Sequence, residues 1–151
     1  MDKLLKLVDQ LALQVPNANR LNNTISNVNI AWHIEHSCLV IIKVTETIMK
    51  SDPNNYGPEF SFRKLLFFVT RKFPRGRAKA PKSVLPDENI TEQHLLESIA
   101  NTKQAISKLV ECHKNQFFSH PIFGNLNVPN TLNFFSIHTN HHLSIIQDIL
   151  K

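Results

Sequence analysis

Near its C-terminal end the sequence reads Phe134-Phe135-Ser136-Ile137-His138-Thr139-Asn140-His141-His142, an apolar run with two histidines four residues apart. At about 100° per residue on a helix, His142 lies about 40° from His138, and Phe134 and Ile145 fall on the same side. His141 falls at the margin of this apolar face. The periodicity therefore predicts a helix that turns His138 and His142 toward a protein core.

The same periodicity marks three more long helices upstream. Capping residues, and a proline in the first turn of the last helix, predict where the helices begin. Prolines that interrupt the apolar pattern predict where helices end. We expect long helices over residues 2–14, from a cap at Thr24 or Ser26 to about 50, from a cap at Thr91 to about 117, and 128–151.

Between the second and third long helices the pattern breaks into a short apolar helix over 62–71 and a proline-punctuated basic loop. No segment alternates strictly between apolar and polar residues, so no strand is expected. The sequence predicts an all-α fold, a four-helix bundle of one domain over 1–151, with this segment inserted between helices two and three.

The length and composition suit one globular core. The 151 residues, of which 42% are hydrophobic, can bury a core without cross-links. Cys38 and Cys112 fall inside apolar helical patterns, so we expect both to stay reduced. No stretch approaches the roughly 20 apolar residues of a membrane-spanning helix, and the start reads as an amphipathic helix rather than a signal peptide. We expect a soluble cytoplasmic protein without membrane association.

The net charge of +5 has its origin in one segment. The 9 bases outside it are outnumbered by the 12 acids, which leaves the rest of the chain at −3. Nucleic acid is not an expected partner, although phosphates and stacked bases would suit such a segment. We expect a lid whose phenylalanines dock on the bundle. The eight bases are Arg63, Lys64, Arg71, Lys72, Arg75, Arg77, Lys79 and Lys82.

Two imidazoles four residues apart on one helical stripe can reach a single ion, because they rise about 6 Å apart. A divalent metal would also satisfy two buried imidazoles at once. The third ligand is expected from the segment around His33 and His36. On a simple bundle, His36 shares a polar stripe with Lys43 and would face solvent, and His33 lies about 60° away. Periodicity alone leaves the choice open.

Glu35 and three other histidines are expected at packing or surface positions. Glu35 points about 100° away from His36, which favours a packing role over that of a general base. His113 falls on the apolar face of the predicted third long helix and is expected in the core. His94 and His120 are expected at the surface or in loops.

The order and placement of two motifs resemble the DinB-like superfamily over most of the chain: Trp32-His33-Ile34-Glu35-His36-Ser37 and His138-Thr139-Asn140-His141-His142. Ala80-Pro81-Lys82 and the stretch from Ser119 to Leu126 are similar to an uncharacterised branch of it. The resemblance implies a four-helix bundle that holds a divalent metal on three histidines, with a dimer as a common state. Carried over to this chain, the ligands are His36, His138 and His142, with His33 as a neighbour.

A site of three imidazoles with an open position can activate water or a thiol, or polarise a substrate. Zinc is the leading expectation, and nickel and iron also suit imidazole ligands. By resemblance, the chain is expected to be a metal-dependent thiol transferase or hydrolase acting on a small molecule, either anionic or a low-molecular-weight thiol. No catalytic residue is assigned, and enzymatic activity stays open. The alternative is a non-catalytic, metal-stabilised binding or interaction module that uses residues 63–82.

Overall fold

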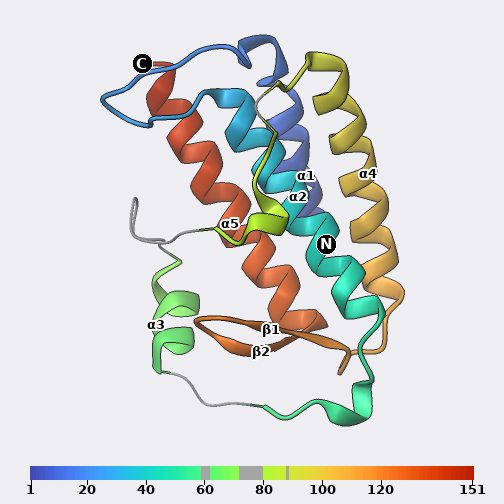
Figure 1. Cartoon of the computed structure of the whole chain (residues 1–151). Helices are drawn as coiled ribbons and strands as arrows, with labels where there is room; N and C mark the ends of the chain where they lie inside the picture. Colours follow the sequence, from blue (N-terminus) through green and yellow to red (C-terminus); the bar gives the residue numbers. More distant parts are fainter. Residues whose placement is uncertain (59–61, 72–79, 88) are drawn as a thin grey trace.

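The computed structural model describes residues 1–58, 62–71, 80–87 and 89–151 of the chain (Figure 1). Most of these residues are helical, so the all-α class holds broadly, with one small sheet in addition. In chain order the elements are α1 (Asp2–Ala12), η1 (Val15–Asn17), α2 (Ile30–Met49), η2 (Pro53–Asn55), α3 (Phe62–Thr70), η3 (Lys82–Val84), α4 (Glu92–Glu111), β1 (Phe117–His120), β2 (Gly124–Asn127) and α5 (Val128–Ile149).

The four long helices run side by side, and α1 and α2 each contact both α4 and α5 (Figure 1). Burial of each large apolar side chain between them contributes about 1.5–3 kcal/mol. None of the helices in the described ranges is long and apolar enough to cross a membrane. The largest fully buried apolar side chains of these helices are Leu4, Leu11, Ile30, Ile34, Ile41, Ile48, Leu95, Ile106, Leu109, Phe135 and Ile146.

Side-chain caps set where three of the long helices begin. Thr91 Oγ1 accepts the N–H of His94 at 3.1 Å, as expected for the start of α4. Asn127 Oδ1 accepts the N–H of Asn130 at 3.2 Å, ahead of an α5 that begins at Val128 as predicted. Helix α2 begins later than predicted, because Asn29 caps it instead of Thr24 or Ser26. Each such cap is worth about 1 kcal/mol.

The predicted third long helix is too long at its C-terminal end. Helix α4 stops at Glu111, and Phe117–His120 pairs antiparallel with Gly124–Asn127 as a β-hairpin that the sequence did not predict. His113, predicted in the core, is exposed between α4 and this hairpin. The prediction failed because the apolar spacing around Phe117 continues past the helix into a strand, where it buries Phe118 instead.

Tertiary hydrogen bonds, rather than a glycine-rich turn pair, hold this hairpin. The side-chain amide nitrogen Nε2 of Gln116 donates to the carbonyl oxygens of Ile48 and Met49 at the end of α2 and of Ser51 just after it. At the turn, Nδ1 of His120 accepts hydrogen bonds from the backbone N–H groups of Ile122 and Phe123. Gly124 closes the turn at φ 66°, a left-handed conformation that suits glycine. Contacts of this kind leave no periodic signal in the sequence.

The inserted segment contains the predicted short helix, which is α3. Its Phe67 is buried and stacks on Phe123 with ring centroids 4.5 Å apart, so one phenylalanine docks on the rest of the fold as expected. Figure 1 shows α3 beside the hairpin, and the ring centroid of Phe67 also lies 6.3 Å from that of Phe134 on α5. The described residues do not include Lys72, Arg75, Arg77 and Lys79 of the basic run, so the predicted basic loop lies largely outside them.

Candidate metal centre

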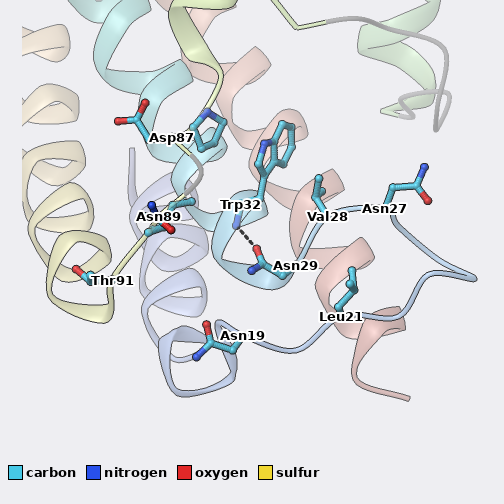
Figure 2. A pocket seen from close by; sticks show the side chains of 11 residues that line it. Asn19, Leu21, Asn27, Val28, Asn29, Trp32, Asp87, Asn89 and Thr91 are labelled. Carbon is cyan, nitrogen blue, oxygen red and sulfur yellow. Dashed lines mark hydrogen bonds between the residues drawn. The ribbon is translucent and has the colours of Figure 1, made fainter.

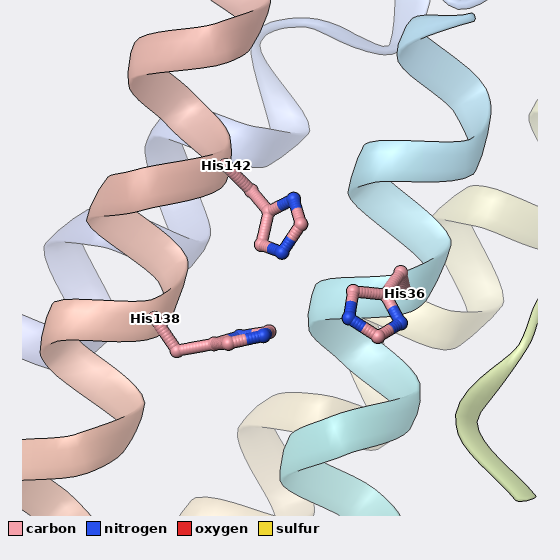
Figure 3. Close-up of side chains that lie close together, drawn as sticks. All are labelled: His36, His138 and His142. Carbon is pink, nitrogen blue, oxygen red and sulfur yellow. The ribbon is translucent and has the colours of Figure 1, made fainter. Parts of the chain in front are cut away.

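Three buried histidines meet between α2 and α5. His36 comes from α2, and His138 and His142 come from α5; one ring nitrogen of each lies within 4.8 Å of the other two. Figure 3 shows the three rings turned toward one another across the gap between the two helices. Their side chains are only 5–8% exposed. Among the described residues, no carboxylate or cysteine joins this group.

The two histidines of α5 lie where the helical periodicity places them. Because they are one turn apart on the buried stripe, their rings are neighbours, with centroids 4.6 Å apart and the ring planes tilted by 58°. The ring of His36 lies 5.2 Å from that of His138 and 4.9 Å from that of His142. The structure therefore brings together the three residues that the resemblance implied as metal ligands.

His36 is buried, although the helical wheel placed it toward solvent. Its Nδ1 lies 2.8 Å from the carbonyl oxygen of Val84 in η3, and Trp32 stacks on the imidazole with centroids 4.8 Å apart. The wheel failed because the inserted segment covers a second face of α2. A carbonyl oxygen can only accept, so Nδ1 of His36 donates. In the neutral ring, the lone pair is therefore on Nε2.

His33 lies beside this group without belonging to it. It is 4% exposed, and its Nδ1 is 3.0 Å from Nδ1 of His142. Its Nε2 is 3.0 Å from Oγ of Ser26 in the loop before α2. His141 is half-buried, with its ring centroid 5.2 Å from that of His142, and it is not in the group either.

The electrostatics keep the three imidazoles neutral. Burial lowers the pKa of His36, and the hydrogen bond to Val84 offsets part of this shift. The pKa values of His138 and His142 lie well below the usual range, first because of burial and then because neighbouring histidines would repel a second positive charge. Neutral imidazoles with available lone pairs are the form that binds a metal ion.

Glu35 faces away from the three histidines. Although it is only 3% exposed, its Oε1 lies 3.0 Å from Nε2 of His94 on α4, and its Oε2 has no hydrogen-bond partner in the part of the chain that the structure describes. The predicted packing role therefore fits better than that of a general base. The side chain of His94 is half-exposed, which agrees with its predicted surface position, and its pairing with Glu35 joins two helices, so helical periodicity gives no signal for it.

Neither cysteine takes part in the group. Cys38 is buried in α2, and burial raises the pKa of its thiol to about 12, which keeps it protonated. Cys112 is half-buried at the end of α4, and burial likewise raises the pKa of its thiol. Both are free thiols, as predicted.

Trp32 also lines a pocket of about 620 Å³ (Figure 2). The same side chain thus contacts both this pocket and the ring of His36. Among the residues that the structure describes, no lysine, arginine or histidine lines this pocket, so they offer no positive surface to an anionic molecule. Its lining residues are Asn19, Leu21, Asn27, Val28, Asn29, Trp32, Pro86, Asp87, Asn89, Ile90 and Thr91.

Comparison with known proteins gives a family without an assigned activity. Residues 9–148 match the family model described as a protein of unknown function, DUF1569. No curated protein and no solved structure matches the chain significantly. The match covers α2 and α5 and therefore all three buried histidines.

Proposed function

The chain belongs to the DUF1569 family, and on this premise we propose that it is a metal-dependent enzyme of the DinB-like type, a single four-helix-bundle domain that holds one divalent ion. In this proposal His36, His138 and His142 are the ligands. The reaction is a thiol transfer or a hydrolysis on a small molecule.

One observation carries the proposal: three neutral imidazoles converge, and no fourth ligand joins them within the described residues. Structural zinc sites are usually closed by four protein ligands, whereas catalytic sites have three and keep one position open. Three buried imidazoles without an ion would each need a separate hydrogen-bond partner in a space that is nearly closed to water. The donor set therefore fits an ion with an open coordination position.

The residues around the group have defined tasks in this proposal. A bound ion would act as a Lewis acid and lower the pKa of a water or thiol at its open position. The carbonyl oxygen of Val84 holds the ring of His36 with Nε2 turned toward the other two histidines. Trp32 stacks on that ring and covers one of its faces.

The imidazole donors suit zinc first, and nickel or iron second. The thiol substrate rests on the resemblance to the superfamily, and a small substrate fits the limited exposure of the group. An anionic substrate would have to meet the basic residues of the inserted segment instead of the pocket beside Trp32, because no described residue that lines that pocket is basic.

The test begins with metal analysis of protein purified without a His tag and without added metal. We expect about one divalent ion per chain, and none in a His138→Ala, His142→Ala double variant. His113→Ala removes an exposed histidine and serves as the matched control. Full metal occupancy in the double variant would overturn the ligand assignment.

Activity is then measured on the metal-loaded protein with low-molecular-weight thiols and an electrophile, and separately with ester and amide substrates. Loss of free thiol, or hydrolysis, should occur in the wild type and in His113→Ala and be absent in the double variant. A protein that binds metal but turns over none of these substrates would support the non-catalytic alternative.

That alternative, an interaction module, has one observation in its favour. Helix α3 exposes four large apolar side chains in nine residues, and the basic run begins on the same helix. A partner that binds there should protect α3 from hydrogen exchange without changing metal content. The four exposed residues are Phe62, Leu65, Leu66 and Val69.

A further inference from the structure

A chain of hydrogen bonds leads from the surface loop before α2 to the three-histidine group. Nδ1 of His142 lies 3.0 Å from Nδ1 of His33, and Nε2 of His33 lies 3.0 Å from Oγ of Ser26. The same Oγ accepts the N–H of Val28 at 3.3 Å. His33 is buried, as is His142, so the contact between the two rings is protected from competing water, and the contact with Ser26 is partly buried. The connection joins α2, α5 and the loop.

If both rings are neutral, the hydrogen bonds along this chain allow two arrangements of the protons. A single proton lies between the two Nδ1 atoms, because one nitrogen donates and the other accepts. In the first arrangement His142 donates from Nδ1, and His33 donates from Nε2 to Ser26. In the second, Ser26 donates to Nε2 of His33, His33 donates from Nδ1, and His142 carries its proton on Nε2.

Only the first arrangement leaves His142 able to bind an ion inside the group. There the lone pair of His142 is on Nε2, as it is for His36, whose Nδ1 donates to the carbonyl oxygen of Val84. In the second arrangement Nε2 is protonated, and Nδ1 is occupied by the hydrogen bond from His33. Loading with metal would then require a proton shift along the whole chain.

We propose that His33, supported by Ser26, is a positioning residue that fixes the Nδ1-protonated form of His142 and so aims its Nε2 at the ion. This inference rests on the proposed three-histidine metal site. A metal-bound histidine commonly donates its other N–H to an oxygen or nitrogen acceptor, and loss of such an acceptor weakens metal binding by about 10–100-fold. His33 would be that acceptor for His142.

The first measurement is zinc affinity by competition with a chromophoric chelator. We expect His33→Ala to bind one zinc ion with about 10–100-fold weaker affinity. His33→Gln should recover part of the loss, because its amide oxygen can accept the N–H of His142. Ser26→Ala should have a smaller effect in the same direction. The matched controls are His113→Ala and Thr24→Ala, which remove an exposed histidine and an exposed hydroxyl.

The second measurement is ¹⁵N NMR of histidine-labelled protein, which distinguishes the two protonation forms of each neutral ring and does not depend on activity. In the wild type, His142 should be protonated on Nδ1 both without metal and with zinc. In metal-free His33→Ala, the Nε2-protonated form, which neutral imidazole prefers in water, should gain population. A merely structural role for His33 would leave this signal unchanged.

The outcomes separate this inference from the function on which it rests. A wild type that binds no zinc would overturn the proposed function, and its metal-free spectrum would still test the tautomer. A His142 protonated on Nε2 in that spectrum would overturn the role of His33. So would His33→Ala with zinc affinity within about twofold of the wild type. If His33→Ala does not fold, His33→Gln and Ser26→Ala give the same comparison.

Discussion

The Nδ1 atom of His36 donates a hydrogen bond to the carbonyl oxygen of Val84, at 2.8 Å. The two residues are 48 positions apart, and Val84 belongs to η3, which begins at Lys82, the last base of the basic run. The inserted segment therefore supplies the hydrogen-bond acceptor that holds His36, although it lies outside the long helices. A change that loosens η3 should therefore alter the position of the His36 ring.

Val84→Ala tests this connection. Removing two buried methyl groups should lower the free energy of unfolding by about 1–3 kcal/mol. Zinc affinity should fall as well, by less than the about 10–100-fold expected when an acceptor is lost, because the backbone carbonyl is still present. Ser83→Ala, at an exposed position of the same turn, is the control. Unchanged zinc affinity in Val84→Ala would show that the turn does not position His36.

His36→Ala and His33→Ala should differ in kind. Loss of a ligand should weaken metal binding beyond the about 10–100-fold expected for loss of an acceptor. It should also change the visible spectrum of the cobalt-substituted protein, because the coordination number or geometry changes. His33→Ala should keep a spectrum close to that of the wild type. If His33→Ala empties the site and His36→Ala leaves affinity and spectrum intact, the ligand assignment is misplaced by three residues.

His94→Ala should destabilise the fold without affecting the metal. It removes the partner of Oε1 of Glu35, a carboxylate only 3% exposed, and an unsatisfied buried acceptor costs about 1–3 kcal/mol. His94→Gln keeps an N–H donor and should recover part of this loss. The measurement is chemical denaturation followed by circular dichroism. Equal stability of His94→Ala and wild type would mean that water replaces the pairing.

The metal-free protein should lose stability as the pH falls below about 6.5, the usual pKa of an unfolded-state histidine. In the folded state, burial lowers the pKa of His36, His138 and His142, and lowers that of His120 to about 4. The unfolded chain therefore binds more protons in this window, and the free energy of unfolding decreases with falling pH.

Denaturation at pH values from 8 down to about 5 checks this sign. His138→Phe removes one buried titrating ring and should show a shallower decline than the wild type, whereas His113→Ala should keep the wild-type slope. A stability that rises as the pH falls would contradict the neutral state of the buried imidazoles.

The basic segment should not bind nucleic acid. Phe67 is buried against Phe123 and cannot stack on a base, and Nζ of Lys64 already donates to the carbonyl oxygen of Asn125 at 3.0 Å. Binding of random single-stranded DNA should therefore be weak at physiological salt. Submicromolar binding with a steep salt dependence would contradict this expectation, provided that it is lost when Arg71, Lys72, Arg75 and Arg77 are neutralised.

Local signals in the sequence predicted much of the helical part of the fold. The start of α5 follows from the proline in its first turn, and the start of α4 follows from Thr91. The spacing of His138 and His142 predicted their shared, buried face, because a helical stripe depends only on residues within the same helix. Such features need no knowledge of distant segments.

The features that the sequence did not predict depend on contacts between distant segments. His36 is buried because Val84 and its turn cover it, and the wheel of α2 contains no information about that turn. The hairpin after α4 depends on Gln116, whose amide binds the end of α2. The hydrogen bond between His33 and His142 joins residues 109 positions apart. Periodicity left the choice between His33 and His36 open, and the resemblance to the DinB-like superfamily selected His36.

Trp32 is the only tryptophan of the chain, and its ring stacks on that of His36 at an interplanar angle of 18°. The tryptophan fluorescence of the protein therefore comes from a ring in direct contact with the histidine group. An ion with a partly filled d shell, such as nickel, should quench this emission, whereas zinc should shift it without strong quenching. The stacked pair gives the protein an intrinsic optical reporter, so metal entry can be followed in real time without any label.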